Sequence, residues 1–190
     1  MSHLGVERAH LAAGGGRILL QLALDAPEAV QSLALLEPGL PLIFNSPEFG
    51  VVAEKAGAMY ESGDKAGAVE AFAREVAGDD FRAAFDRTLP PGHFERWVAA
   101  ADTLFQVDLA GPAWTFTRED AARITQPVLN MVGVGTRTYF REVYETIRTW
   151  LPQAENVELP DATHSMLQTN PRGAAEVLAD FFSRHRMQGY

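Results

Sequence analysis

The sequence contains no cysteine among its 190 residues. This absence excludes disulfide bonds, thiolate nucleophiles and cysteine-based metal sites, and it permits a reducing compartment. Basic residues are few as well: 16 Lys and Arg stand against 25 Asp and Glu, which gives a net charge of −9. Because nucleic acid binding requires a concentrated basic surface, we expect no nucleic acid partner.

Long hydrophobic runs are also missing. No apolar stretch approaches the roughly 20 residues of a membrane span, and the first residues lack the basic and then apolar pattern of a secretion signal. We therefore expect a cytoplasmic protein that does not associate with a membrane. Apolar residues make up 47% of the chain and charged residues 22%, which is typical of one globular domain that carries a sizeable core.

The first 38 residues predict a strand–helix–strand unit. Residues 8–13 (RAHLAA) read as a short strand and are followed by the glycine turn Gly14–Gly16. Residues 17–25 carry apolar side chains on one helical stripe, and the apolar run at residues 30–38 has the length of a strand covered on both faces. Two strands joined by a helix at this spacing are parallel.

The remaining residues predict helices first and then a return of strands. Helical spacing of apolar residues predicts four helices in succession, over residues 46–63, 64–78, 79–89 and 93–107. The parallel pattern then resumes with strands over residues 126–135 and 154–160, each followed by a helix, over residues 138–152 and 171–185. The fold class is α/β: a mostly parallel sheet of about four strands with flanking helices and an inserted helical cap. We assign residues 1–41 and 124–190 to the α/β core and residues 42–123 to the cap.

This order resembles the C-terminal part of an α/β-hydrolase. The resemblance rests on LALLEPGLP before the helical insertion, ITQPVLNMVG after it, and LPDATHSMLQTNPRGAAEVLADFFSRH at the end. The opening GVERAHL, its glycine turn and LLQLALDAPEAVQSLALLEP are similar to the family's nucleophile strand, the helix behind it and the next strand. The resemblance implies a core with an inserted helical cap and the hydrolysis of an ester or similar bond in an apolar small molecule.

The chain departs from the family at the turn. The family has a Gly-x-Ser-x-Gly elbow there, which exposes the nucleophile and supplies an oxyanion-hole N–H. Here LAAGGGR is about two residues too short and offers no Ser, Cys or Asp. The family's first strands and its second oxyanion-hole donor would lie before Met1, so we expect a shortened fold with a degenerate catalytic triad and impaired chemistry.

Two residues match the remaining triad positions. His164, in a loop between a strand and a helix capped by Asn170, matches the family's general base; the alternative is a loop histidine with no task. The family's usual acid position, after PVLNMVG, holds no carboxylate before Glu142. Glu37 matches the end of the preceding strand, where some members place the acid. The alternative is a helix-capping or solvent-facing carboxylate.

Other candidates favour structural roles. Asp161 is expected to form a turn, Gly14–Gly16 a tight packing turn, and Ser2 and Ser165 are hydroxyls without an elbow. His3, His10, His93 and His185 show no metal-ligand spacing, so we expect no metal and no cofactor. The aromatic residues of the cap are expected to pack in its core and to make the substrate pocket apolar; they are Phe72, Phe81, Phe85, Phe94, Trp97 and Phe105.

The sequence thus favours an α/β-hydrolase-like protein that acts on a small apolar molecule with impaired catalysis. The alternatives are a non-catalytic remnant that binds a small apolar ligand or a partner subunit, and an incomplete gene model. Because the strand at residues 8–13 would lie at an exposed sheet edge, we expect a homodimer formed through that edge. We also expect an oxygen of Glu37 within roughly 3.5 Å of a ring nitrogen of His164.

Overall fold

A four-stranded sheet forms the centre of the computed structural model, which describes residues 5–14, 16–108 and 114–187. The strands are β1 (Ala9–Ala13), β2 (Val30–Leu36), β3 (Val128–Gly133) and β4 (Glu155–Leu159). They pair in the order β1-β2-β3-β4, and every pair is parallel. The prediction of about four parallel strands is confirmed. Parallel strands end at one edge of a sheet, so the loops that follow them gather there.

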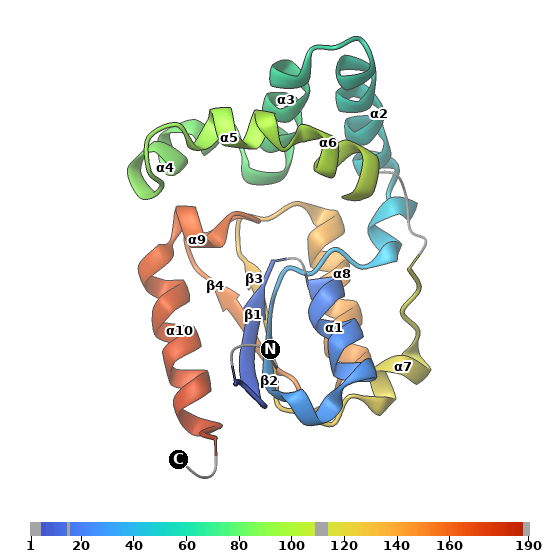
Figure 1. Ribbon diagram of the computed structural model, residues 1–190, viewed down its shortest axis with the longest axis vertical. Helices are drawn as coiled ribbons and strands as arrows, with labels where there is room; N and C mark the ends of the chain where they lie inside the picture. Colours follow the sequence, from blue (N-terminus) through green and yellow to red (C-terminus); the bar gives the residue numbers. More distant parts are fainter. Residues whose placement is uncertain (1–4, 15, 109–113, 188–190) are drawn as a thin grey trace.

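Helices cover both faces of the sheet (Figure 1). The core helices are α1 (Gly16–Asp25), α8 (Thr138–Trp150), α9 (Met166–Thr169) and α10 (Pro171–Arg184), with a short 3-10 turn η2 (Pro27–Ala29) before β2. Asn170 caps α10 by accepting a hydrogen bond from the Gly173 N–H at 3.0 Å, as expected, and Pro171 begins the helix.

Alternate residues of the strands serve two separate cores. Leu33 and Leu35 of β2 pack with α1 and α8 on one face. Ala34 and Leu36 pack with Phe181 of α10 on the other. Because successive side chains of a strand point to opposite faces, a strand covered on both sides is largely apolar. This explains why residues 30–36 show no alternation of apolar and polar positions.

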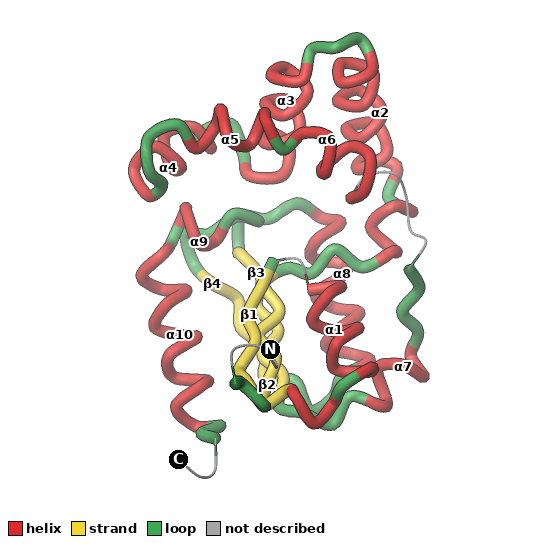
Figure 2. Tube along the Cα trace, in the orientation of Figure 1, coloured by secondary structure: helices red, strands yellow, loops and turns green. Residues whose placement is uncertain are grey.

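The segment between β2 and β3 consists, in its described residues, of helices joined by turns and loops. Its elements are η3 (Pro41–Asn45), α2 (Pro47–Glu61), α3 (Lys65–Ala77), α4 (Phe81–Thr88), α5 (His93–Ala99), α6 (Ala101–Thr103), the π-helical turn η4 (Leu104–Asp108) and α7 (Arg118–Arg123). Helices α2 to α6 lie beyond the carboxyl edge of the sheet, whereas α7 lies at the opposite end beside α8 (Figure 2). The helices α2 to α6 therefore sit over the loops that follow the strands.

One predicted helix is wrong in its extent. Residues 93–107 form α5, α6 and η4 instead of one helix, with a turn at Ala100. The break lets two aromatic side chains meet different partners: Trp97 stacks on Phe85 of α4, and Phe105 stacks on Tyr60 of α2. Tertiary packing thus overrides the helical periodicity of this segment.

In the described residues, no helix is long and apolar enough to cross a membrane.

Candidate active site

Glu37 lies at the carboxyl end of β2 with a fully buried side chain. Its backbone has φ +50°, a left-handed conformation that non-glycine residues adopt infrequently. The carboxylate accepts three hydrogen bonds: from the Gly133 N–H at 2.7 Å, from the Thr136 hydroxyl at 2.7 Å and from His164 Nδ1 at 2.9 Å. An ionised carboxylate only accepts, so three donors suit it. The solvent-facing alternative for Glu37 is wrong.

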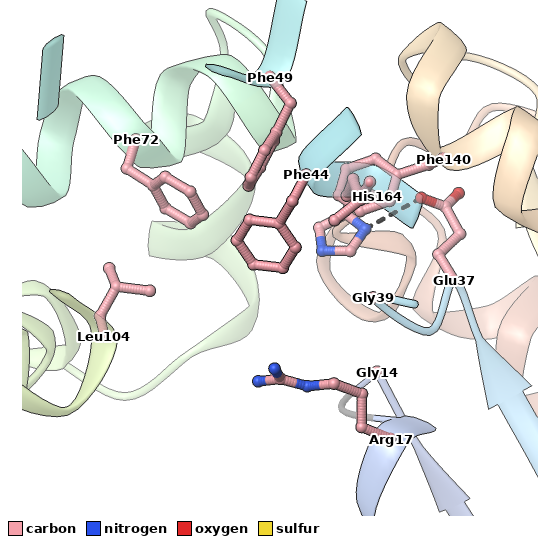
Figure 3. A pocket seen from close by; sticks show the side chains of 11 residues that line it. Gly14, Arg17, Glu37, Gly39, Phe44, Phe49, Phe72, Leu104, Phe140 and His164 are labelled. Atoms are coloured by element: carbon pink, nitrogen blue, oxygen red, sulfur yellow. Dashed lines mark hydrogen bonds and ion pairs between the residues drawn. The ribbon is translucent and has the colours of Figure 1, made fainter. Parts of the chain in front are cut away.

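The contact between Glu37 and His164 was expected and is confirmed. Oε2 of Glu37 lies 2.9 Å from Nδ1 of His164. Because the carboxylate accepts, Nδ1 carries the proton, and a neutral ring then keeps its lone pair on Nε2. Nε2 points away from Glu37 into the cavity drawn in Figure 3. The arrangement can take a proton from a group in the cavity and give it back.

The loop that carries His164 is fastened to the end of β3. The Gly135 N–H donates to the Ala162 carbonyl at 2.8 Å. A Cβ on Gly133 would collide with the backbone of Ala162 and Thr163, so glycine is needed for this close approach. The imidazole itself stacks on Phe140, with centroids 3.8 Å apart and planes 7° apart. Its position is therefore set by both the backbone and the ring beneath it.

Helix α3 is tied to the same loops. Arg137 donates from Nε to the Glu75 carbonyl at 2.8 Å and lies 3.2 Å from its carboxylate, and the Thr163 hydroxyl donates to the Ala77 carbonyl at 3.1 Å. Near this junction, burial raises the pKa of the Tyr139 phenol well above its usual range. The tyrosine therefore stays protonated and is an unsuitable base.

A cavity of about 240 Å³ opens beside His164. Its lining also includes Glu37, Gly14, Gly39 and Arg17, and Figure 3 shows Gly14 and Arg17 across the cavity from Phe49. Most of the remaining wall is apolar: Ile43, Phe44, Phe49, Phe72, Leu104 and Phe140. Apolar walls with a few polar groups are typical of small-molecule sites. Of the six aromatic residues singled out in residues 42–123, Phe72 lines this cavity and the other five do not.

None of the described residues that line this cavity carries a hydroxyl or a thiol. The glycine turn is the place at which the sequence resemblance puts a nucleophile elbow. Gly16 begins α1, and a Cβ there would collide with the side chain of Pro38. This close approach supports the packing interpretation of the turn. Gly15 lies outside the described residues, as do Ser2 and His3.

The other described candidates make no hydrogen bond to the Glu37 carboxylate. Asp161 has φ +53° in a turn, as expected. Ser165 precedes α9 and lines a second cavity with His93. His10 contacts Ser32, and His185 contacts Glu155. Within the described ranges, no three His, Asp or Glu side chains are grouped as ligands for a metal ion.

The site also uses three residues that sequence reasoning missed. Thr136 stands in the loop after β3, where the family's usual carboxylate was sought, and its hydroxyl binds Glu37 instead. The Gly133 amide leaves no signal in a sequence, because every non-proline residue has one. Arg17 follows the glycine turn, and its charge at the start of a helix was the available signal.

Solved structures share this fold. Carboxylesterase CesB from Bacillus subtilis matches over 95% of this chain and 61% of its own, with 23% identity and a TM-score of 0.70. The enol-lactonase from Burkholderia xenovorans LB400 matches over 96% and 68%, with 17% identity and a TM-score of 0.67. MGS-M2, an alpha/beta hydrolase enzyme from a Medee basin deep-sea metagenome library, matches over 99% and 70%, with 17% identity and a TM-score of 0.72.

The chain spans less than two thirds of the length of the carboxylesterase. Comparison with protein family models gave no match, and comparison with curated proteins gave none either.

Proposed function

We propose, from the α/β-hydrolase fold of this chain, that it binds a small apolar molecule in a site suited to ester-type hydrolysis and that its hydrolytic chemistry is impaired. The contact of 2.9 Å between Glu37 and His164 beside an apolar cavity carries this proposal. A buried carboxylate with three donors, paired with a stacked imidazole, is a stronger indication of an active site than either residue alone. Burying the Glu37 carboxylate costs desolvation energy, which argues for a function in which the imidazole is held in one orientation.

In the proposed site, His164 is the general base and Glu37 orients it. Glu37 fixes the proton on Nδ1, and Nε2 faces the bound molecule. A histidine of this kind usually takes the proton of a serine hydroxyl, which then attacks the carbonyl carbon. The described lining of the cavity supplies no such hydroxyl. The covalent route is therefore closed to these residues, and little rate enhancement is left.

The second candidate function is binding without catalysis, either of a small apolar ligand or of a partner subunit. The absent hydroxyl favours it, and the intact pair of Glu37 and His164 favours retained chemistry. We also propose that residues 1–41 and 124–190 act as the core and residues 42–123 as a cap. This division would place the ligand between the two parts. A cytoplasmic location and a homodimer are further proposals.

Two measurements on purified protein test the proposed function. The first is saturable binding of a non-hydrolysable ketone analogue of p-nitrophenyl butyrate, measured by calorimetry. Phe72→Ala enlarges the cavity. Ala179→Ser, on the exposed face of α10, is the matched control. The second is release of nitrophenolate from p-nitrophenyl butyrate by the parent and by His164→Ala. We expect binding that only the Phe72 substitution changes, and hydrolysis near the buffer rate.

The outcomes separate the two candidates. Turnover well above the buffer rate that His164→Ala abolishes would show that catalysis survives. Binding without turnover would favour the non-catalytic function. An absence of binding in the parent would contradict both small-molecule proposals.

A further inference from the structure

A second cavity is also lined by His164. It has a volume of about 340 Å³ and shares Phe72 and His164 with the first cavity. Val76, Phe85, Leu89 and Trp97 form its apolar wall. A molecule held with its reactive bond at His164 therefore has room for one arm in each cavity. The first cavity is bounded partly by Arg17 and Gly14 of the core, whereas the second is bounded mainly by α3, α4 and α5.

The lining of the second cavity includes a histidine, His93, whose Nε2 has no hydrogen-bond partner among the described residues. The side chain of His93 is 11% exposed, and its Nε2 atom is buried and unpaired. Its closest acidic oxygen, Asp86 Oδ1, lies 3.7 Å away, beyond hydrogen-bond distance. Asp86 is largely exposed to solvent, which weakens any ion pair between them. An unpaired buried imidazole nitrogen is costly, because it has given up water without gaining a partner.

The surroundings of His93 restrict what such a partner can be. The His93 ring lies 6.0 Å from the ring of Phe85 between centroids, and Phe85 stacks on Trp97 at 5.7 Å with planes 16° apart. These two flat rings favour an aromatic or planar apolar group. Ser165 and Gln168, beside His164, are the other polar residues of the lining. The polar positions thus lie at His93 and around His164, with apolar side chains making up the rest of the wall.

We propose that the second cavity recognises an apolar, preferably aromatic, arm of the ligand that carries a hydroxyl group, and that this hydroxyl binds Nε2 of His93. This inference rests on the proposed function, since it assumes that a small apolar molecule occupies the site beside His164. A hydroxyl is the fitting group because it both donates and accepts, so it pairs with either tautomer of His93. An ester of a hydroxyaryl compound therefore fits both the walls and the polar position at His93.

Two probes that differ only in the hydroxyl group test the inference. We would measure the affinity of the full chain for 4-propylphenol and for propylbenzene by calorimetry, and follow the side-chain ¹⁵N resonances of the histidines. We expect the phenol to bind about tenfold more tightly, the effect of one buried hydrogen bond. We also expect it to shift the Nε2 resonance of His93. Equal affinities in the unmodified protein would overturn the inference without any variant.

Variants of His93 give a second test. His93→Phe keeps a ring in the wall and should remove the preference for the phenol, whereas His93→Gln retains a polar group and should keep part of it. His185→Phe, in a histidine that binds Glu155 away from both cavities, should change neither affinity. A preference that survives His93→Phe would refute the assignment.

The test also separates this inference from the proposed function. If both probes bind equally well, the apolar site stands and the role of His93 fails. If neither probe binds, the proposed small-molecule function fails together with the inference.

Discussion

Glu37 and His164 are separated by 127 residues in the sequence, and Oε2 of the first lies 2.9 Å from Nδ1 of the second. The parallel sheet explains this meeting. Glu37 follows β2 and His164 follows β4, and both strands end at the same edge of the sheet. The strand between them, β3, supplies the Gly133 amide and the Thr136 hydroxyl that hold the carboxylate. Two loops and one strand end thus converge on a single side chain.

Replacing Glu37 should destabilise the fold as well as the site. Glu37→Gln keeps the shape but turns one acceptor oxygen into a donor, which then faces the donors that bound the carboxylate. We expect the free energy of unfolding to fall by roughly 2–4 kcal/mol, as measured by urea denaturation. Thr136→Val, which removes one of the three donors, should cost about 1 kcal/mol. Equal stability of Glu37→Gln and the parent would contradict the observed network.

Sequence reasoning found the fold and this pair for a physical reason. Strand-length apolar runs, a glycine turn and a capped last helix are local signals, and right-handed parallel connections then fix which loops lie together. The resemblance to a known family supplied the roles of His164 and Glu37. It was needed because the sequence around Glu37, a carboxylate before a proline, does not decide whether the side chain is buried or faces solvent. Fold and pair were therefore predictable from patterns that extend over the whole chain.

The rest depended on packing that no local pattern encodes. The break at Ala100 arises because Trp97 and Phe105 meet rings on different helices. The stacking of Phe140 on His164 joins residues from α8 and the loop after β4, which are adjacent only in three dimensions. The unpaired nitrogen of His93 is visible only once its neighbours are placed.

The unmodified protein should form no acyl-enzyme. A fluorophosphonate reacts with an activated serine hydroxyl, and the cavity beside His164 has none among its described lining residues. We expect intact mass spectrometry to show no adduct after incubation with the probe. Stoichiometric labelling would contradict the proposed lack of a nucleophile. Ser165, next to His164 in the chain and in the lining of the second cavity, would then be the first position to map.

Gly14 offers a position at which to restore a hydroxyl. A Cβ there would meet only the Leu36 carbonyl, at an ordinary distance of 3.6 Å, and Gly14 lines the cavity with His164. We therefore expect Gly14→Ser to fold and to gain labelling by the fluorophosphonate. His164→Ala in that background should lower the labelling rate by on the order of 10²-fold, the usual contribution of a general base.

Gly14→Ala is the matched control for this substitution, since it adds the Cβ without the hydroxyl. It should remain unlabelled. Labelling of Gly14→Ser that is unaffected by His164→Ala would show that the imidazole does not reach this position.

The protonation of His10 should make stability depend on pH. Burial lowers the pKa of His10 below 6.5, and the neighbouring charge of His185 lowers it further. The unfolded chain therefore binds a proton at higher pH than the folded one, so stability is complete above about pH 6.5 and falls as the pH drops through that value. His10→Gln, which retains a partner for Ser32 but does not titrate, should flatten this part of the pH profile measured by urea denaturation.

His185→Gln gives the second half of this test. Removing the charge of His185 should raise the pKa of His10 toward its usual value, as seen by NMR titration, and should narrow the pH range in which stability is lost. If the unmodified protein became more stable as the pH fell from 7 to 5.5, and His10→Gln removed that increase, the pKa of His10 would be raised by folding and not lowered.

The exposed edge of the sheet should make the protein associate. Within the described residues β1 pairs with β2 alone, and its five residues are all at least partly exposed. Strand edges without charge are templates for another strand, and β1 carries no Lys, Arg, Asp or Glu. We expect a homodimer in sedimentation at tens of micromolar protein. Ala12→Lys places a charge on this exposed strand and should shift the protein to the monomer.

Ala179→Lys, on the exposed face of α10, is the control for this substitution and should leave the dimer intact. A monomer in the unmodified protein at that concentration, or a dimer that Ala12→Lys leaves unchanged, would rule out association through β1.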